Sequence, residues 1–181
     1  MRLSWLTLLV VLAGCSTGKL VIEPDNRLVA ETAELRQANG ETSGLNVSIR
    51  IFDAGNSQQS SIYVAASQVR EVERRYLPYV LKQTLDRSGF WGAVRVLPNV
   101  DPSAEININA TIIESSGTGL SLQVRVTTAM GQVWFDQIYQ DVTDPNDYTT
   151  DPDYVKDTFQ DVYSRIANDM SRRLLAHSED R

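Results

Sequence analysis

The stretch from Ala104 to Val142 contains three consecutive segments that read as strands, Ala104–Glu114, Leu120–Thr127 and Val133–Val142. Apolar and polar residues alternate in the first two, whereas the third carries apolar groups on both faces and is expected to be either a covered central strand or an interaction edge. An alternation with a period of two residues is typical of strands that bury one face. Because short, turn-rich connections join antiparallel neighbours, this run predicts an antiparallel arrangement of three strands.

The polar positions of the first two segments are expected to share one face of that sheet. They are Asn107, Asn109, Gln123 and Arg125. The isoleucines, leucine and valines between them would form the buried face. We therefore expect the second face of the sheet to be polar and open.

Two further strands and two helices are predicted outside this run. The strands are Leu45–Ile51 and Ala93–Leu97, and the helices span about Gln68–Ser88 and Asp153–His177. The first helix carries a broad apolar face with a period of 3.6 residues, starting with Val69, Val72 and Tyr76. Its Pro78 predicts a kink or a division into two shorter helices.

The predicted order is strand, helix, four strands, helix. A helix between the first two strands allows them to pair in parallel, whereas the later strands are antiparallel. We therefore predict an α+β fold with a four- or five-stranded, mostly antiparallel (mixed) sheet and two helices packed on one face.

The N-terminus predicts a secretory signal peptide over residues 1–14. Arg2 supplies the positive charge, and Leu3–Leu12 is apolar but shorter than the roughly 20 residues that span a bilayer. Leu-Ala-Gly-Cys then ends at Cys15, the single cysteine of the chain. The alternatives are an uncleaved membrane helix and a secreted protein with a free thiol, which an oxidising compartment disfavours.

The Leu12–Cys15 tetrad resembles a bacterial lipobox. The resemblance implies a diacylglycerol on the Cys15 sulfur, cleavage before Cys15 and acylation of the new amine; these acyl groups are the only cofactor-like attachment we expect. Several acyl chains anchor a protein stably. Ser16 is similar to the signal for transfer to the outer membrane, so we expect a lipid-anchored protein that faces the periplasm.

The rest of the chain divides into a lipidated N-terminus and tether (residues 15–44), one α+β domain (45–177) and a tail (178–181). The formal net charge is −6. An acidic surface disfavours nucleic acid and adhesion to anionic lipid, so the acyl chains are the expected link to the membrane. With one cysteine, the domain has no disulfide to stabilise it.

The residues needed for common catalytic and metal sites are scarce. His177 is the only histidine and lies in the last turn of the second helix. Cys15 is taken up by lipid, so nucleophilic and zinc sites lack their usual groups. The aspartates between Asp141 and Asp153 offer oxygen ligands for calcium, but a solvated loop is the simpler interpretation. We predict a non-enzymatic protein without a metal; a hydrolase ranks last.

Four aromatic residues are the candidate partner-binding residues. Phe90 and Trp91 follow the end of the first helix, and Trp134 and Tyr139 lie on the last strand. Exposed aromatic side chains are frequent anchors of protein interfaces. The alternative is that the Phe90–Trp91 pair belongs to the core.

The segment Leu81–Val96, a helix ending in Ser-Gly-Phe followed by a strand with alternating valines, resembles a group of periplasmic modules. This group includes the N-terminal domain of the Tol translocation protein, the curli-secretion lipoproteins and the lipoprotein activators of penicillin-binding proteins. The resemblance implies a related strand and helix order over residues 45–176 and no enzymatic activity.

The resulting expectation is a protein-binding adaptor in a cell-envelope assembly, with an envelope protein as partner. The alternative is a membrane-anchored carrier or sensor of a small molecule or lipid, for which a cavity lined by Ile108, Val124 and Phe159 would be required. The sequence leaves the oligomeric state open.

Overall fold

A computed structural model describes residues 33–40, 43–55, 64–143 and 157–179. The predicted signal peptide, Cys15 and Ser16 lie outside these residues, as does most of the aspartate-rich loop. Among the described residues, no helix combines the length and the apolar character needed to cross a bilayer.

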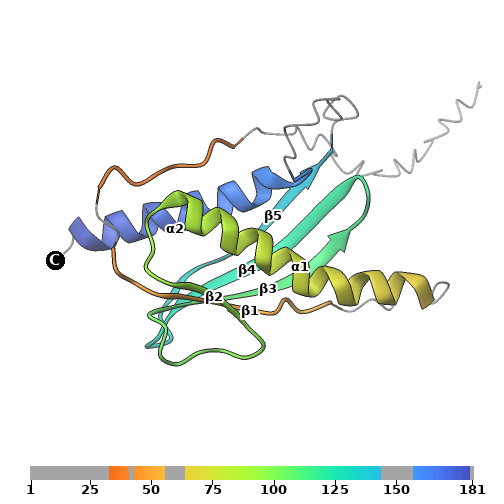
Figure 1. The fold of residues 1–181 in the computed structure, drawn as a ribbon, viewed down its shortest axis with the longest axis horizontal. Coiled ribbons are helices and arrows are strands. Elements are labelled where there is room, and N and C mark those ends of the chain that lie inside the picture. The colour runs from red at the N-terminus through yellow and green to blue at the C-terminus, as the bar shows by residue number, and fades with distance from the viewer. Residues whose placement is uncertain (1–32, 41–42, 56–63, 144–156, 180–181) are drawn as a thin grey trace, which may run out of the picture.

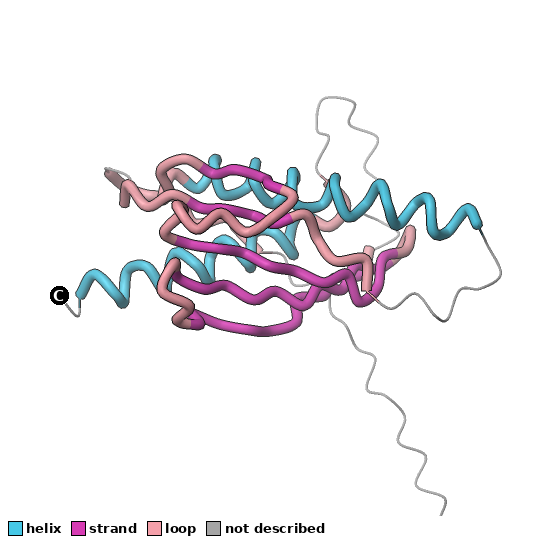
Figure 2. The backbone as a smooth tube through the Cα atoms, turned by 90° about the horizontal axis from the view of Figure 1, so that it is seen from below, coloured by secondary structure: helices cyan, strands magenta, loops and turns pink. Residues whose placement is uncertain are grey.

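The described chain forms a five-stranded sheet with two helices on one face (Figures 1 and 2). The elements are, in chain order, β1 (Val47–Arg50), α1 (Val64–Ser88), β2 (Val94–Leu97), β3 (Ile106–Ser115), β4 (Gly119–Thr128), β5 (Val133–Val142) and α2 (Gln160–Glu179). This arrangement confirms the predicted α+β fold class and its element order.

The sheet has the strand order β2-β1-β3-β4-β5. The three consecutive segments predicted as strands form the antiparallel part, β3-β4-β5, as expected. β1 pairs in parallel with β2 on one side and with β3 on the other. The sheet therefore has two parallel pairs rather than one, because the chain passes from β2 across β1 to reach β3.

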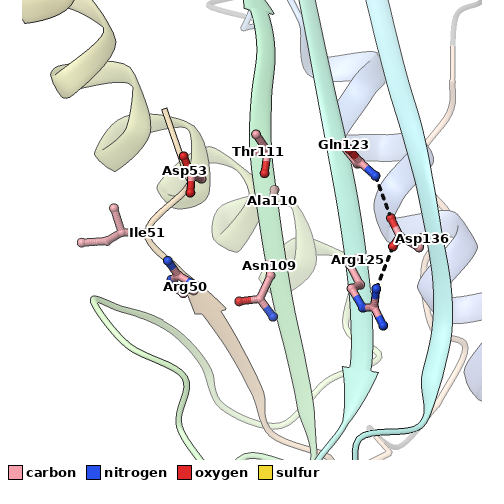
Figure 3. Close-up of a pocket in the computed structure, with 9 residues that line it drawn as sticks. All are labelled: Arg50, Ile51, Asp53, Asn109, Ala110, Thr111, Gln123, Arg125 and Asp136. Carbon is pink, nitrogen blue, oxygen red and sulfur yellow. Dashed lines mark hydrogen bonds and ion pairs between the residues drawn. The ribbon is translucent and has the colours of Figure 1, made fainter. Parts of the chain in front are cut away.

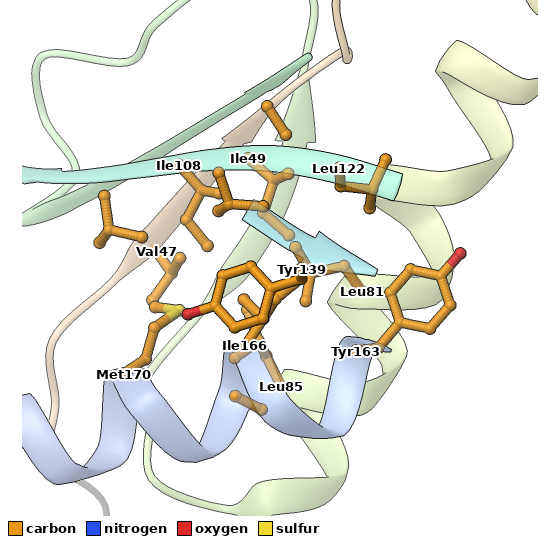
Figure 4. Close-up of a cluster of buried hydrophobic side chains, with 14 of the residues drawn as sticks. Val47, Ile49, Leu81, Leu85, Ile108, Leu122, Tyr139, Tyr163, Ile166 and Met170 are labelled. Atoms are coloured by element: carbon orange, nitrogen blue, oxygen red, sulfur yellow. The ribbon is translucent and has the colours of Figure 1, made fainter. Parts of the chain in front are cut away.

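The core lies between the sheet and the helices (Figure 4). Pairing of Ile49 with Ile108 and of Val124 with Ala110 keeps the apolar positions of β1, β3 and β4 on one face. From the helices, Leu81 and Ile166 reach the same layer and are fully buried. The hydrophobic faces predicted for β3 and β4 therefore form most of the floor of this core.

Pro78 lies inside α1, which is one continuous helix, so the alternative of two shorter helices is wrong. A proline cannot donate to the carbonyl four residues earlier, here that of Arg74. The Phe52 N–H donates to this carbonyl over 3.0 Å, and Arg74 Nε donates to the Phe52 carbonyl over 3.2 Å. The acceptor released by the proline thus joins the helix to the end of β1.

The N-terminal part of α1 extends past the sheet (Figure 1). Val69, Val72 and Tyr76, predicted as part of the buried face, are each more than half exposed. Their spacing matches that of core positions, but the sheet ends before it reaches them. Only the later part of the predicted face, from Leu77 onward, is buried.

The folded unit begins before residue 45, the boundary predicted from the sequence. The Asn168 side chain on α2 accepts from the Arg36 N–H and donates to the Glu34 carbonyl, both over 2.8 Å. The Ala38 N–H donates to the Ser88 carbonyl at the end of α1. These bonds fix residues 34–38 on the domain.

Candidate functional site

An apolar groove of about 920 Å³ opens where the helix layer meets one end of the sheet. It is bounded by the last turns of α2, the start of β3, the turn between β4 and β5, and the segment before β1. Its apolar lining is Ala38, Leu45, Phe90, Ile106, Ala129, Met130, Trp134, Leu174 and Leu175. Pockets that bind ligands are mostly apolar with few polar groups, and this groove has that composition.

Trp134 lies in the groove because β5 contains a β-bulge. Val126 pairs with Phe135 whereas Thr127 pairs with Val133, so Trp134 is the extra residue between them. A bulge redirects a side chain from its regular face, and Trp134 and Phe135 both pack against the core. The Trp134 ring lies 6.3 Å from that of Trp91, measured between centroids.

Phe90 is held at the groove by the residues on either side of it. Gly89, with φ +72°, ends α1 in the left-handed conformation that glycine adopts readily. The Phe90 carbonyl accepts from the Ser43 N–H over 2.9 Å and from Ser43 Oγ over 2.7 Å. One wall of the groove is therefore a rigid corner tied to the segment before β1.

The groove rim carries one fixed carboxylate and two exposed apolar side chains. Glu105 Oε2 accepts from the Asn46 N–H over 2.8 Å, and this hydrogen bond is the main reason why the pKa of Glu105 is lowered. Met130, in the turn between β4 and β5, is 97% exposed, and Leu175 is 41% exposed. The rim is thus negatively charged at neutral pH beside apolar groups that face solvent.

The structure corrects the prediction of four exposed aromatic anchors. Phe90, Trp91 and Tyr139 are only 8%, 4% and 6% exposed, so as anchors they would have too little free surface. Phe90 and Trp134 contribute to the groove, whereas Trp91 lies behind Trp134 in the core. The alternative that the Phe90–Trp91 pair belongs to the core is correct.

Tyr139 faces the helices rather than a partner surface. Its hydroxyl donates to Asp169 Oδ2 over 2.7 Å, and Gln137 Nε2 donates to the Tyr139 hydroxyl. Burial, followed by the Asp169 carboxylate, raises the pKa of Tyr139 above its ordinary value. This network joins β5 to α2.

The internal cavity required for the carrier alternative is absent from the described residues. Ile108 and Val124 are fully buried, and Phe159 packs against the same core. The groove lies at the end of this core instead. Its position depends on contacts between distant segments, so Leu45, Met130 and Leu175 carried no signal in the sequence.

The polar face predicted for the sheet is confirmed, with one difference. Asn109, Gln123 and Arg125 line a shallow depression on the side away from the helices (Figure 3). Asn107, on the same face, is buried, and its Nδ2 donates to the Ala104 carbonyl in the connection before β3.

No group of three or more histidine, cysteine, aspartate or glutamate side chains within the described ranges could hold a metal ion. His177, in the last turn of α2 as predicted, lines the groove. Apart from the carboxylate of Glu105, its neighbours along the groove are mostly apolar or uncharged.

Comparison with known proteins identifies no family. No family model matches the chain, and no curated protein matches it. Among solved structures, it is similar to the hypothetical protein CT253 from Chlamydia trachomatis, with 13% sequence identity and a TM-score of 0.42. The match covers 71% of this chain and 94% of that chain.

Proposed function

We propose that this chain is a non-enzymatic lipoprotein of the cell envelope whose domain binds a partner protein through the apolar groove. Acyl groups on Cys15 would anchor it to the outer membrane, facing the periplasm. The observation that supports binding is the groove itself, which is lined by Trp134 and carries the exposed apolar side chains of Met130 and Leu175 on its rim.

The chemistry of the groove favours a peptide segment with apolar side chains. Binding energy at protein interfaces is concentrated in apolar and aromatic contacts within such depressions. Met130 is unbranched and fully exposed, so it can adapt to the shape of an inserted side chain. Glu105 adds a fixed negative charge at the rim, which favours a partner segment with a lysine or arginine beside its apolar anchors.

A second candidate function is the binding of an apolar small molecule or lipid. The volume of about 920 Å³ supports it, because pockets for small ligands typically measure about 300–1,000 Å³. In this case the anchored domain would act as a carrier or sensor. The two functions predict different outcomes. A carrier or sensor should copurify with a small apolar molecule, whereas a protein-binding adaptor should crosslink to a protein through the groove.

The test places a photo-crosslinking amino acid at Gln132, on the groove, in living cells. Leu175→Lys introduces a charge into the rim, and Val100→Lys is the matched control because Val100 is similarly exposed (49% against 41%) but lies outside the groove. If replacing the rim leucine by a charged side chain costs about 2 kcal/mol of binding free energy, affinity falls roughly 30-fold. We expect one envelope protein to be crosslinked. The amount of this crosslinked product should be strongly reduced by Leu175→Lys and unchanged by Val100→Lys.

Equal crosslinking in both variants would contradict a role of the groove. If no protein is crosslinked and mass spectrometry of the purified chain finds a bound apolar molecule that Leu175→Lys removes, the second candidate is favoured. Membrane fractionation of Cys15→Ser tests the anchor separately. Retention of the variant in the outer membrane, with unchanged processing, would refute lipidation at Cys15.

A further inference from the structure

The face of the sheet opposite the helices holds a second, chemically different depression, of about 250 Å³ (Figure 3). Side chains from β1, β3, β4 and β5 form it, together with residues just after β1. Its polar lining is Arg50, Asp53, Asn109, Thr111, Gln123, Arg125 and Asp136. Most of these groups project from paired strands, so the backbone holds their points of attachment in fixed register.

Three of the lining side chains have no bonding partner among the described residues. Arg50, Asn109 and Thr111 make no side-chain hydrogen bond or ion pair with the described parts of the chain. Arg50 follows Ile49, which pairs with Ile108, so Arg50 and Asn109 are neighbours across β1 and β3. They therefore offer donors and acceptors that are free to bind a ligand.

The opposite wall is fixed by internal bonds. Arg125 Nη1 lies 3.1 Å from Asp136 Oδ2, and Gln123 Nε2 donates to Asp136 Oδ1 over 3.2 Å. Asp53 Oδ1 accepts from the Gly55 N–H, which orients that carboxylate. The two arginines and the two aspartates of the site balance in charge.

Polar atoms next to the depression also lack partners. Ser48 and Asn107 pair across β1 and β3 on this same face and are 2% and 6% exposed. Neither Ser48 Oγ nor Asn107 Oδ1 has a hydrogen-bond partner among the described residues. Buried polar atoms are normally satisfied by protein, water or ligand, so this face has unmet hydrogen-bonding capacity.

From these observations we propose that the depression binds an uncharged, hydroxyl-rich small molecule, namely a sugar unit. A hydroxyl group both donates and accepts, which matches the mixture of free guanidinium, amide and hydroxyl groups. The balanced charge favours a neutral ligand over an ion. The volume lies below the usual range for drug-sized ligands, so the site accommodates about one sugar ring. This proposal is independent of the apolar groove.

Saturation-transfer NMR on the full-length chain tests the proposal, in a detergent without a sugar headgroup. The probes are maltose and N,N′-diacetylchitobiose at millimolar concentration. Inorganic phosphate, which has no carbon-bound proton, is the anionic probe and is followed by broadening of its phosphorus NMR signal. We expect saturation transfer to at least one sugar. Arg50→Met should weaken binding about tenfold or more, as expected for a lost hydrogen bond to a charged group.

Two further variants separate binding from folding. Thr111→Val removes the hydroxyl but keeps the branched shape that suits a strand, and should weaken binding several-fold. Arg173→Met, on the exposed side of α2, is the matched control for Arg50→Met and should leave binding unchanged. Leu175→Lys should also leave it unchanged, which keeps this test distinct from that of the groove.

If neither sugar shows saturation transfer, the proposal is overturned. It is also overturned if the Arg50→Met and Thr111→Val variants both bind the sugar as tightly as the wild type. Binding of phosphate that depends on Arg50, without binding of either sugar, would identify an anion site instead and would likewise overturn it.

Discussion

Replacement of Tyr163 and of Tyr139 by phenylalanine should affect the free energy of unfolding in different ways. Both side chains are buried in the layer between sheet and helices. The Tyr163 hydroxyl has no hydrogen-bond partner among the described residues, whereas the Tyr139 hydroxyl bonds to Asp169 and Gln137. Replacement by phenylalanine removes the hydroxyl and leaves the ring, so the packing contribution stays nearly constant.

The expected free energies follow from the state of each hydroxyl. A buried polar group without a partner costs about 1–3 kcal/mol, so Tyr163→Phe should leave the free energy of unfolding unchanged or raise it by about 1 kcal/mol. Tyr139→Phe loses a hydrogen bond to a carboxylate, which contributes about 1.5–3 kcal/mol. Because Asp169 retains Arg172 and Gln137, we expect a loss near the lower end of that range.

Urea denaturation, followed by tryptophan fluorescence and by circular dichroism, measures both variants. The two probes should give the same transition, and the slope with urea concentration should match that of the wild type. A destabilisation by Tyr163→Phe as large as that by Tyr139→Phe would show that the Tyr163 hydroxyl has a partner and would refute the reasoning.

Two further predictions concern stability. Burial raises the pKa of Tyr139 and Tyr163 above the ordinary value of 10.0, so above pH 10 the unfolded chain ionises first and stability falls as the pH rises. Above pH 10, each tyrosine lowers the free energy of unfolding by up to about 1.4 kcal/mol per pH unit. Between pH 9 and 11, the free energy of unfolding should therefore fall less steeply with pH in each Tyr→Phe variant than in the wild type. An unchanged dependence on pH would contradict the assigned burial. Gly55 has φ +69°, and an added Cβ would lie 2.5 Å from the Ile112 carbonyl oxygen, whereas nothing lies within 4 Å of that position at Gly117. Gly55→Ala should lower the free energy of unfolding by at least about 1–3 kcal/mol and Gly117→Ala by far less, and equal thermal stability of the two variants would argue against this backbone geometry.

The periodic elements of this fold could be predicted because their signal is local. The alternation in β3 and β4 reflects one face turned to the core and one to solvent, and each of these two strands carries that pattern in its own residues. The same holds for the apolar face of α2 and for Gly89 at the end of α1. These features determine the α+β class and the presence of a polar sheet face.

The site depended on contacts that no local pattern contains. Whether an apolar helix position is buried depends on where the sheet ends, which is why Val72 is exposed although its spacing is that of a core residue. Trp134 reaches the groove only because of a bulge in the pairing with β4. The carbonyl released by Pro78 becomes useful only when Phe52 lies beside it.

The sequence by itself determined which segments are strands and helices and which of their faces are apolar, because side-chain periodicity follows from the geometry of the backbone. Only the tertiary structure decided that Phe90, Trp91 and Tyr139 are buried, that a groove lies between Leu45, Met130 and Leu175, and that unpaired polar groups gather around Arg50. Burial and cavity shape are properties of several segments together, and their packing in space, rather than their order in the chain, sets them.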